Sequence, residues 1–269
     1  MSTTSIYNPL APLLRREGTR TRRARRPGIL SEHQIAPWVG LPQEIRRLAV
    51  SKLGEPSGVA PPRRPEEYIV ATEAGVSARI IGNALDEIGR VFAKEKVHVR
   101  FADRATGSHA VPGDDPDGMV QGTMADGTCR IVAEFKTPWT TNLGKFTSKK
   151  RRQLLDALMD SGWAKAQIAA YMNAYSCRFG FVSTYDQTIL IKRAGKYRFL
   201  VSDVFEASQV SAGTVEAPQI STREALWYLA MQARYSVDWK WTWRPADRAA
   251  LINGSFNLGH DIRERKRRR

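Results

Sequence analysis

The sequence predicts an α/β domain in which helices flank a mixed β-sheet. Three patterns support this: a helical periodicity over residues 72–94, a strict alternation over residues 97–101, and a hairpin signal over residues 119–136. The chain has 269 residues, 42% of them hydrophobic, so it is long enough to bury a sizeable core. The expected order of helix, three strands, helix and further strands is typical of an α/β architecture.

The first expected helix, residues 72–94, repeats apolar side chains every three or four positions, as one face of a helix does. These side chains belong to Val76, Ile80, Ala84, Ile88 and Val91. Thr72 is a suitable N-cap because its hydroxyl can accept a hydrogen bond from the first turn. Residues 97–101 then alternate apolar and polar side chains, which predicts a half-buried strand.

The hairpin signal consists of two strand-like runs, residues 119–124 and 129–136, on either side of Asp126-Gly127. Asp-Gly favours the tight turns that join antiparallel strands. By the same criteria we expect later helices at about 151–160, 163–176 and 221–236, and strands at 178–183, 188–192 and 197–201.

The composition divides the chain into four parts. Residues 1–64 form a basic, largely disordered N-terminal region with a short helix, and residues 65–205 form the compact core. Residues 206–262 are a helical, Trp-rich extension, and residues 263–269 are a basic tail. No stretch has the ~18 uninterrupted apolar residues of a membrane helix, so we expect no membrane partner.

The charge is strongly positive, with 42 Lys and Arg against 27 Asp and Glu, or +15 net. Residues 15–26 hold seven Arg and one Glu, and residues 263–269 hold six basic residues and one Glu. Such a field suits a polyanion, above all nucleic acid, and the tails suit a nuclear address. A mitochondrial address ranks lower because prolines interrupt the N-terminal stretch. The alternative for the tails alone is a solubilising role.

Cysteine and histidine are sparse. Cys129 and Cys177 stand far apart in the sequence, and four scattered histidines have no metal-ligand spacing. We therefore expect neither a disulfide framework nor a zinc site, and we expect a reducing compartment.

Three charged residues of the hairpin, Asp117, Glu134 and Lys136, are expected to converge. Strand side chains alternate between faces, so Glu134 and Lys136 share one face while Phe135 lies on the other. Because the turn lies between the strands, the start of the first strand and the end of the second are neighbours. Two carboxylates and an ammonium together suit a hard divalent cation with a bound water.

This pattern resembles the PD-(D/E)XK nuclease superfamily: Pro116-Asp117, sixteen residues, then Glu134-Phe135-Lys136. Downstream, Gln167 and Tyr171 match the Gln-xxx-Tyr helix motif of the RecB and lambda-exonuclease branch. The resemblance implies a restriction-endonuclease-like core with a helix, a three-stranded antiparallel meander, a helix and a further strand. It implies a metal-dependent nuclease that uses Mg²⁺ or Mn²⁺.

The resemblance also implies a role for each site residue. Asp117, Glu134 and an acid on the first helix bind the metal, and Lys136 orients or helps to deprotonate the attacking water. Gln167 and Tyr171 hold the substrate backbone or the catalytic carboxylates. Glu73 is the predicted helix acid. Glu87, fourteen residues later and expected on nearly the same face, is the rival.

A basic stretch follows the predicted site and has no acid in it. Its members are Lys145, Lys149, Lys150, Arg151 and Arg152. They are candidates to bind the phosphates of a nucleic acid, with DNA favoured over RNA, and the alternative is a solvated helix start.

A second possible function keeps the fold without the chemistry. The run that begins at Cys177 is also similar to fungal nuclease-like domains, including Crinkler-type effectors. The chain would then be a catalytically inactive nucleic-acid-binding or effector module that acts through binding.

Overall fold

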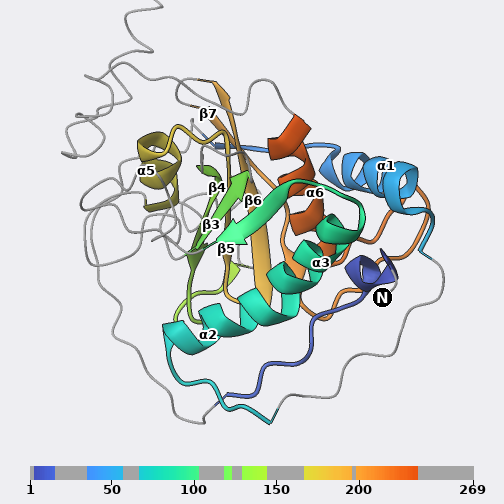
Figure 1. Ribbon diagram of the computed structural model, residues 1–269. Coiled ribbons are helices and arrows are strands. Elements are labelled where there is room, and N and C mark those ends of the chain that lie inside the picture. The colour runs from blue at the N-terminus through green and yellow to red at the C-terminus, as the bar shows by residue number, and fades with distance from the viewer. Residues whose placement is uncertain are drawn as a thin grey trace, which may run out of the picture.

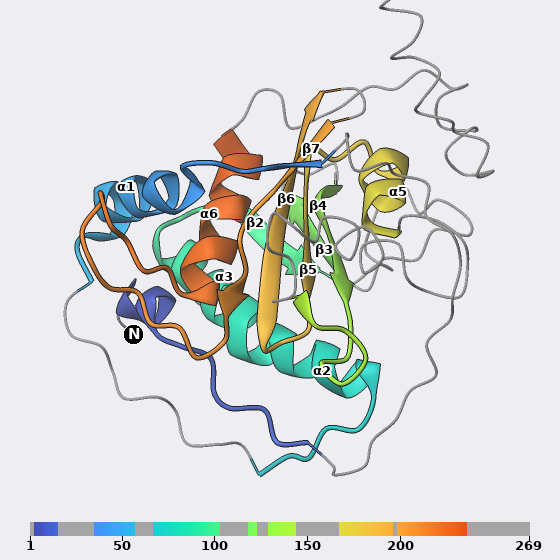
Figure 2. The ribbon, with the colours of Figure 1, turned by 180° about the vertical axis from the view of Figure 1, so that it is seen from behind.

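The computed structural model describes residues 3–15, 35–56, 67–102, 118–122, 129–143, 167–195 and 198–235. In this part of the chain a mixed β-sheet stands between helices on both of its faces (Figure 1, and from behind in Figure 2). The predicted α/β class with a mixed sheet is therefore confirmed.

The helical elements of the described residues are a 3-10 helix η1, five α-helices and one π-helical turn η3. They are η1 (Thr3–Tyr7), α1 (Leu41–Leu53), α2 (Glu73–Ile80), η3 (Ile81–Leu85), α3 (Asp86–Lys94), α5 (Gln167–Ala174) and α6 (Thr222–Tyr235). The strands are β1 (Ile35–Pro37), β2 (Val99–Ala102), β3 (Gly118–Gly122), β4 (Cys129–Phe135), β5 (Phe179–Ser183), β6 (Gln187–Gly195), β7 (Arg198–Val201) and β8 (Phe205–Glu206).

The sheet has the strand order β1-β7-β6-β5-β4-β3-β2, and β8 pairs with β6. β4 runs parallel to β5 and β1 runs parallel to β7, whereas the other described pairs are antiparallel. The predicted hairpin is the β3–β4 pair, in which Gly118 lies opposite Ala133. A β-bulge interrupts this ladder at Arg130, because Val120 pairs with Ile131 and the next pair is Gln121 with Cys129.

Each face of the sheet has its own apolar core. Ile131, Ala133 and Phe135 of β4 belong to the cluster that packs under α2, α3 and α6. Val132, the residue between them, belongs to the second cluster, with Ile168 of α5. The predicted alternation of β4 side chains is therefore confirmed, and α5 covers the face opposite to α2, α3 and α6 (Figure 1).

The predicted helix over residues 72–94 forms, but a π turn interrupts it. Thr72 caps it as expected, since its hydroxyl accepts a hydrogen bond from the Gly75 N–H at 3.1 Å. In η3 the wider turn makes the Asn83 carbonyl accessible, and it accepts a hydrogen bond of 2.7 Å from Arg223 Nε of α6. The Asn83 amide donates to the Tyr185 hydroxyl at 2.9 Å. Partners distant in sequence thus hold the π turn, and local periodicity does not reveal them.

The N-terminal region differs from the expectation of a largely disordered segment over residues 1–64. Ile6, Tyr7 and Leu10 are buried in the same cluster as the helices of the predicted core, and α1 joins them. The Ser221 hydroxyl donates to the Ile6 carbonyl at 2.6 Å, which ties this segment to the start of α6. The sequence did not indicate this because η1 is too short to show a period.

A buried ion pair joins α1 to α6. Arg46 Nε lies 3.0 Å from Glu224 Oε1, and Arg46 Nη2 donates to Glu224 Oε2 at 3.2 Å. Neither side chain has any exposed surface. Arg46 also donates to the carbonyls of Gly213 at 2.9 Å and Gln219 at 2.7 Å, so the guanidinium fixes the loop before α6 as well. A bidentate pair with further hydrogen bonds is the arrangement that offsets the cost of burying two charges.

Glu224 also completes the N-terminal cap of α6. The Glu224 N–H donates to the Ser221 hydroxyl at 3.1 Å, as in a capping box. The reciprocal link runs through Ser211, whose hydroxyl donates to Glu224 and accepts from the Ser221 N–H. Burial raises the pKa of Glu224, and it outweighs the lowering effects of Arg46 and Ser211.

Replacing Arg46 tests this pair. We expect Arg46→Met to lower the free energy of unfolding at pH 7 by about 3–5 kcal/mol, because it leaves a buried carboxylate without its cation. A raised folded-state pKa means that the folded protein binds more protons than the unfolded chain, so stability falls as pH rises through that pKa. Without Arg46 the pKa of Glu224 rises further, and the loss should be smaller at pH 5 than at pH 7.

Urea denaturation at the two pH values measures this difference. Arg47→Met, a change at the exposed neighbouring position, is the control and should change little at either pH. Equal losses for Arg46→Met at pH 5 and pH 7 would contradict the proposed role of the Glu224 charge.

Candidate functional site

The candidate site lies where β4 ends. Glu134 is the last residue but one of β4, and Lys136 follows the strand directly. Both side chains are buried, with exposed fractions of 4% and 8%, and Lys136 Nζ donates a hydrogen bond to Glu134 Oε1. The Lys136 backbone N–H donates to the Ser183 carbonyl at 2.9 Å, so pairing with β5 continues past the strand end and fixes the lysine.

Each of the two opposite charges lowers the free-energy cost of burying the other in this position. A carboxylate taken out of water is costly unless a cation or several donors lie beside it, and the Lys136 ammonium is such a cation. The pair stands at the end of a strand in the middle of the sheet, with β3 on one side and β5 on the other. Such a pair can offer carboxylate oxygens to a cation and hydrogen-bond donors to water or an anion.

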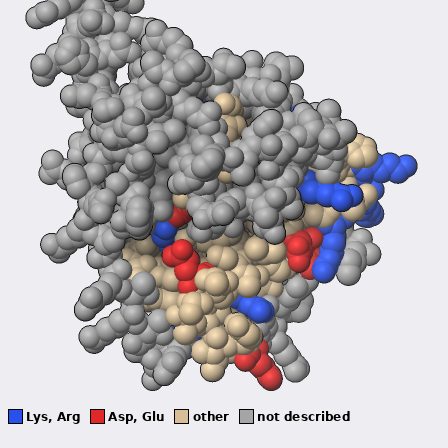
Figure 3. Space-filling model, turned by 60° about the vertical axis from the view of Figure 1, so that its left-hand side comes forward, with Lys and Arg blue, Asp and Glu red and all other residues tan. Residues whose placement is uncertain are grey.

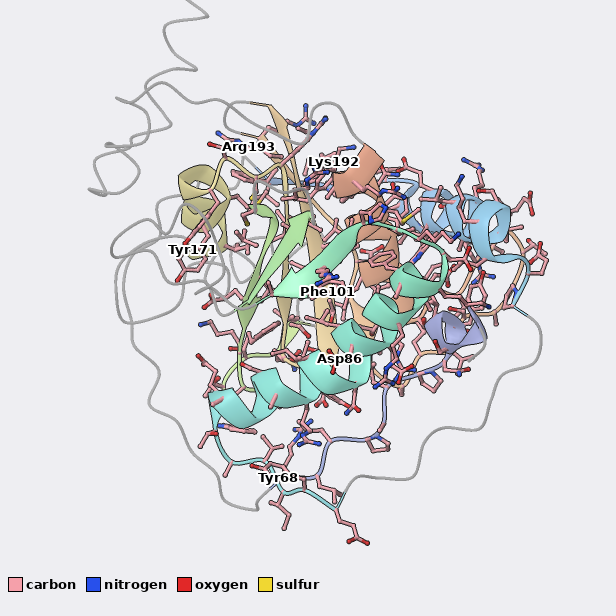
Figure 4. The ribbon with its side chains drawn as sticks, in the orientation of Figure 1. Tyr68, Asp86, Phe101, Tyr171, Lys192 and Arg193 are labelled. Atoms are coloured by element: carbon pink, nitrogen blue, oxygen red, sulfur yellow. The ribbon has the colours of Figure 1, made fainter. Side chains whose placement is uncertain are left out.

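Helix α5 brings Tyr171 to the same face of the sheet. α5 packs against β4 and β5, and Tyr171 is buried in the cluster that contains Val132. Val132 and Glu134 are two residues apart on β4 and share a face, so α5 covers the face that carries Glu134. Figure 4 shows Tyr171 projecting from α5. Gln167 is the first residue of α5, and its side chain lies outside the described part.

Gly180 of β5 lets α5 approach the sheet closely. A Cβ atom at this position would lie 3.1 Å from Met172 Sδ and 3.2 Å from two side-chain carbons of Ile168. Both residues belong to α5: Ile168 lies one helical turn before Tyr171, and Met172 follows it directly. A glycine inside a strand run is the sequence signal for such a close approach, and Gly180 lies inside the predicted strand 178–183.

The two candidate helix acids have different surroundings. Glu73 is the exposed first residue of α2, and α2 packs against β4. Glu87 is buried in α3 and accepts a hydrogen bond from Arg90 at 2.7 Å. The π turn Ile81–Leu85 lies between the two acids, and Asp117, to which their distances would be compared, lies outside the described residues. Glu73 remains our predicted helix acid, with Glu87 as its rival.

Other predicted site residues fall outside the described part of the chain. Asp117 is one of them, and its neighbour in the sequence, Gly118, pairs with the residue before Glu134. The basic stretch is also outside: Lys145, Lys149, Lys150, Arg151 and Arg152. Among the described residues no three His, Cys, Asp or Glu side chains come together as a metal site. Figure 3 shows acidic groups gathered beside a basic group at the border of the undescribed atoms.

The two cysteines are neighbours in space, which sequence separation did not suggest. The Sγ atoms of Cys129 and Cys177 lie 3.5 Å apart as free thiols. The parallel pairing of β4 and β5 brings their starts together, and Cys177 stands just before β5. Burial raises the pKa of Cys177, so the thiol form is favoured and reactivity is low.

Comparisons of the chain with family models, with curated proteins and with solved structures find no match. Within the described residues no helix has the length and apolar character needed to cross a bilayer.

A pair of glycine substitutions tests how closely α5 packs against β5. Gly180→Ala should lower the melting temperature, because the new methyl group meets Met172 and Ile168 at less than normal contact distance. Gly89→Ala in α3 is the matched control, because a Cβ there meets nothing within 4 Å. We expect it to raise stability by about 0.4–1 kcal/mol. Equal melting temperatures for the two variants would contradict the close packing of α5.

Proposed function

We propose that the protein is a metal-dependent nuclease that hydrolyses phosphodiester bonds of nucleic acid. The observation that carries this proposal is the buried Glu134–Lys136 pair at the end of β4. It stands on the hairpin whose first strand directly follows Pro116-Asp117 in the sequence. A carboxylate and an ammonium at one strand end match the chemistry that the PD-(D/E)XK resemblance implies.

The order of the elements supports the same proposal. The helix formed by α2, η3 and α3 precedes three antiparallel strands, β2, β3 and β4. α5 follows, and then β5 pairs in parallel with β4. This is the order of helix, meander, helix and strand expected for a restriction-endonuclease-like core, and its two helical segments lie on opposite faces of the sheet.

The available donors fit a hard divalent cation. Glu134 supplies carboxylate oxygens, and in this proposal Asp117 and Glu73 supply the others, so the set consists of oxygen ligands that suit Mg²⁺ or Mn²⁺. When bound, such an ion would stabilise negative charge on the phosphoryl oxygens and lower the pKa of a bound water.

The side chains of the chain itself would orient the reactants. The Lys136 ammonium, which donates to Glu134, would orient or help to deprotonate the attacking water and stabilise charge on the phosphoryl oxygens. In the reaction the water oxygen forms a bond to phosphorus as the water gives up a proton to solvent, and the bridging P–O ester bond breaks so that its oxygen leaves as an alcohol after taking up a proton from solvent. Gln167 and Tyr171 would hold the substrate backbone or the carboxylates from the side of α5.

The metal requirement is the first test. Purified full-length protein should nick or degrade plasmid DNA or RNA with Mg²⁺ or Mn²⁺ and should stop when excess EDTA is added. The measurement is product formation on a gel over time, with and without the chelator. Cleavage that continues undiminished in excess EDTA would refute the oxygen-ligand metal site.

Replacing Lys136 separates catalysis from binding. Lys136→Ala should reduce the cleavage rate by about 10²-fold or more, since a positioned group that stabilises the transition state is lost. Binding should stay almost unchanged, because Lys136 is one of 42 Lys and Arg residues. The control is Lys94→Ala, at the exposed last position of α3, which should change neither.

The rate and binding measurements also distinguish the alternative function. If Lys136→Ala cleaves at the wild-type rate, the assignment of the site is wrong. If wild type and variant both bind nucleic acid equally and neither cleaves it with either metal, the inactive binding module replaces the nuclease.

A further inference from the structure

Two backbone irregularities direct the two cysteine thiols to one point on the α5 face of the sheet. The first is the β-bulge at Arg130. Ile131 packs in the core under α2, α3 and α6, and in a regular strand Cys129, two residues earlier, would share that face. The extra residue of the bulge reverses the alternation, and Cys129 is buried in the opposite cluster, with Val132.

The second irregularity is the left-handed backbone of Ser176, whose φ is 53°. This conformation is uncommon for a residue with a side chain and is typical of the position that ends a helix. It turns the chain back after α5, and the Cys177 N–H donates to the Met172 carbonyl at 2.7 Å. The turn thereby fixes Cys177 in the cluster that contains Cys129.

The two thiols are in contact. Cys177 Sγ lies 3.5 Å from Cys129 Sγ and 3.4 Å from the Cys129 carbonyl oxygen. The Cα atoms of a disulfide lie about 4.4–6.8 Å apart, and neighbouring strands such as β4 and β5 are about 4.8 Å apart. The spacing of the backbone therefore suits a bond between the two sulfur atoms.

The surroundings of the thiols also suit such a bond. The cluster around them is built largely from apolar side chains, among them Ile168, Val182 and Ile191. A disulfide has no charge and no hydrogen-bond donor, so an apolar cluster accepts it readily. The hydrogen bond that oxidation removes from the Cys129 thiol, to the Ile131 carbonyl at 3.3 Å, is a weak one.

We propose that Cys129 and Cys177 form a reversible internal disulfide when the protein meets a peroxide. In a reducing compartment the dithiol is the resting form, and the disulfide is the form that follows oxidation. This inference concerns two side chains that the proposed cleavage does not use, so it does not rest on the proposed function.

Burial determines which sulfur reacts first. Cys129 keeps an exposed fraction of 6%, whereas Cys177 has none. Cys129 Sγ forms a bond to one peroxide oxygen, the O–O bond breaks, and the other oxygen leaves as water with the thiol proton. Cys177 Sγ then forms a bond to Cys129 Sγ, the S–O bond breaks, and the oxygen leaves as water with the Cys177 proton. The two cysteines lose two electrons in total, which reduce the peroxide to two waters.

The second step is slow, because burial raises the pKa of the Cys177 thiol and its thiolate is scarce. We therefore expect the bond to form over hours rather than seconds.

The disulfide closes a loop that contains much of the candidate site. The two cysteines are 48 positions apart in the sequence, and Glu134, Lys136 and Tyr171 lie between them. The bond also ties the end of α5 to the start of β4. Closing a loop of this length restricts the unfolded chain far more than the folded one, so the disulfide should stabilise the fold.

Hydrogen peroxide is the probe that tests the proposal. Full-length wild-type protein is treated with it in EDTA, and the remaining thiols are blocked with N-ethylmaleimide before intact-mass analysis and peptide mapping. We expect the number of added maleimides to fall from two to none, because the chain has two cysteines. The map should show one peptide pair joined through Cys129 and Cys177, and dithiothreitol should restore both thiols.

The melting temperature of the oxidised protein should exceed that of the reduced protein by about 5–10 °C. Cys129→Ala and Cys177→Ala are the matched controls, since each leaves one thiol, and peroxide should not raise the melting temperature of either. If Cys177→Ala does not fold, Cys129→Ala is the control, and the mass analysis of the wild type needs no variant.

A redox equilibrium measures the same link between oxidation and folding. In mixtures of reduced and oxidised dithiothreitol, the folded protein should be half oxidised at about a 10²–10³-fold higher ratio of reduced to oxidised reagent than the chain unfolded in guanidinium chloride.

Any of three results would overturn the inference. They are two thiols that both survive the peroxide, sulfinic acids or covalent dimers in place of the internal bond, and an equal ratio for the folded and the unfolded chain. A protein that forms the internal disulfide and cleaves no nucleic acid with either metal would support this inference and refute the proposed function.

Discussion

The ion pair between Arg46 and Glu224 is the interaction on which the arrangement of the helices depends. It joins α1 to the start of α6; the Arg46 side chain also donates to the Gly213 carbonyl, and the Glu224 backbone N–H donates to the Ser221 hydroxyl of the cap. Because both charges are fully buried, the pair tolerates little displacement. α6 in turn holds η1 through Ser221 and the π turn through Arg223.

The Glu134–Lys136 pair makes no direct contact with this ion pair and is linked to it only through strand β4. The Glu134–Lys136 pair lies on the face that α5 covers, whereas α6 and the ion pair lie on the other face. Both sets of contacts meet in β4, since Phe135 packs into the core under α6 while Glu134 and Lys136 point the opposite way. One strand thus transmits the rigidity of a packed core to two charged side chains.

Local sequence patterns were enough to predict the β3–β4 hairpin, the shared face of Glu134 and Lys136, and the N-cap of α2 at Thr72. What they missed depends on contacts between distant segments. The π turn needs Arg223, η1 needs α6, and the cysteines meet only because β4 and β5 are parallel. A period of 3.6 or 2 residues contains no information about such partners. Asp117 remains a prediction, since it lies outside the described part of the chain.

The burial of the N-terminal segment has a consequence for synthesis of the protein. The hydrogen bond from Ser221 to the Ile6 carbonyl spans 215 residues, and the Arg46–Glu224 pair spans 178. During translation the N-terminal segment cannot bury its apolar side chains against α6 until almost the whole described chain has left the ribosome. These side chains belong to Ile6, Tyr7 and Leu10. Contacts of such long range slow folding and prolong the exposure of apolar surface, so chaperones have a long window in which to bind the nascent chain.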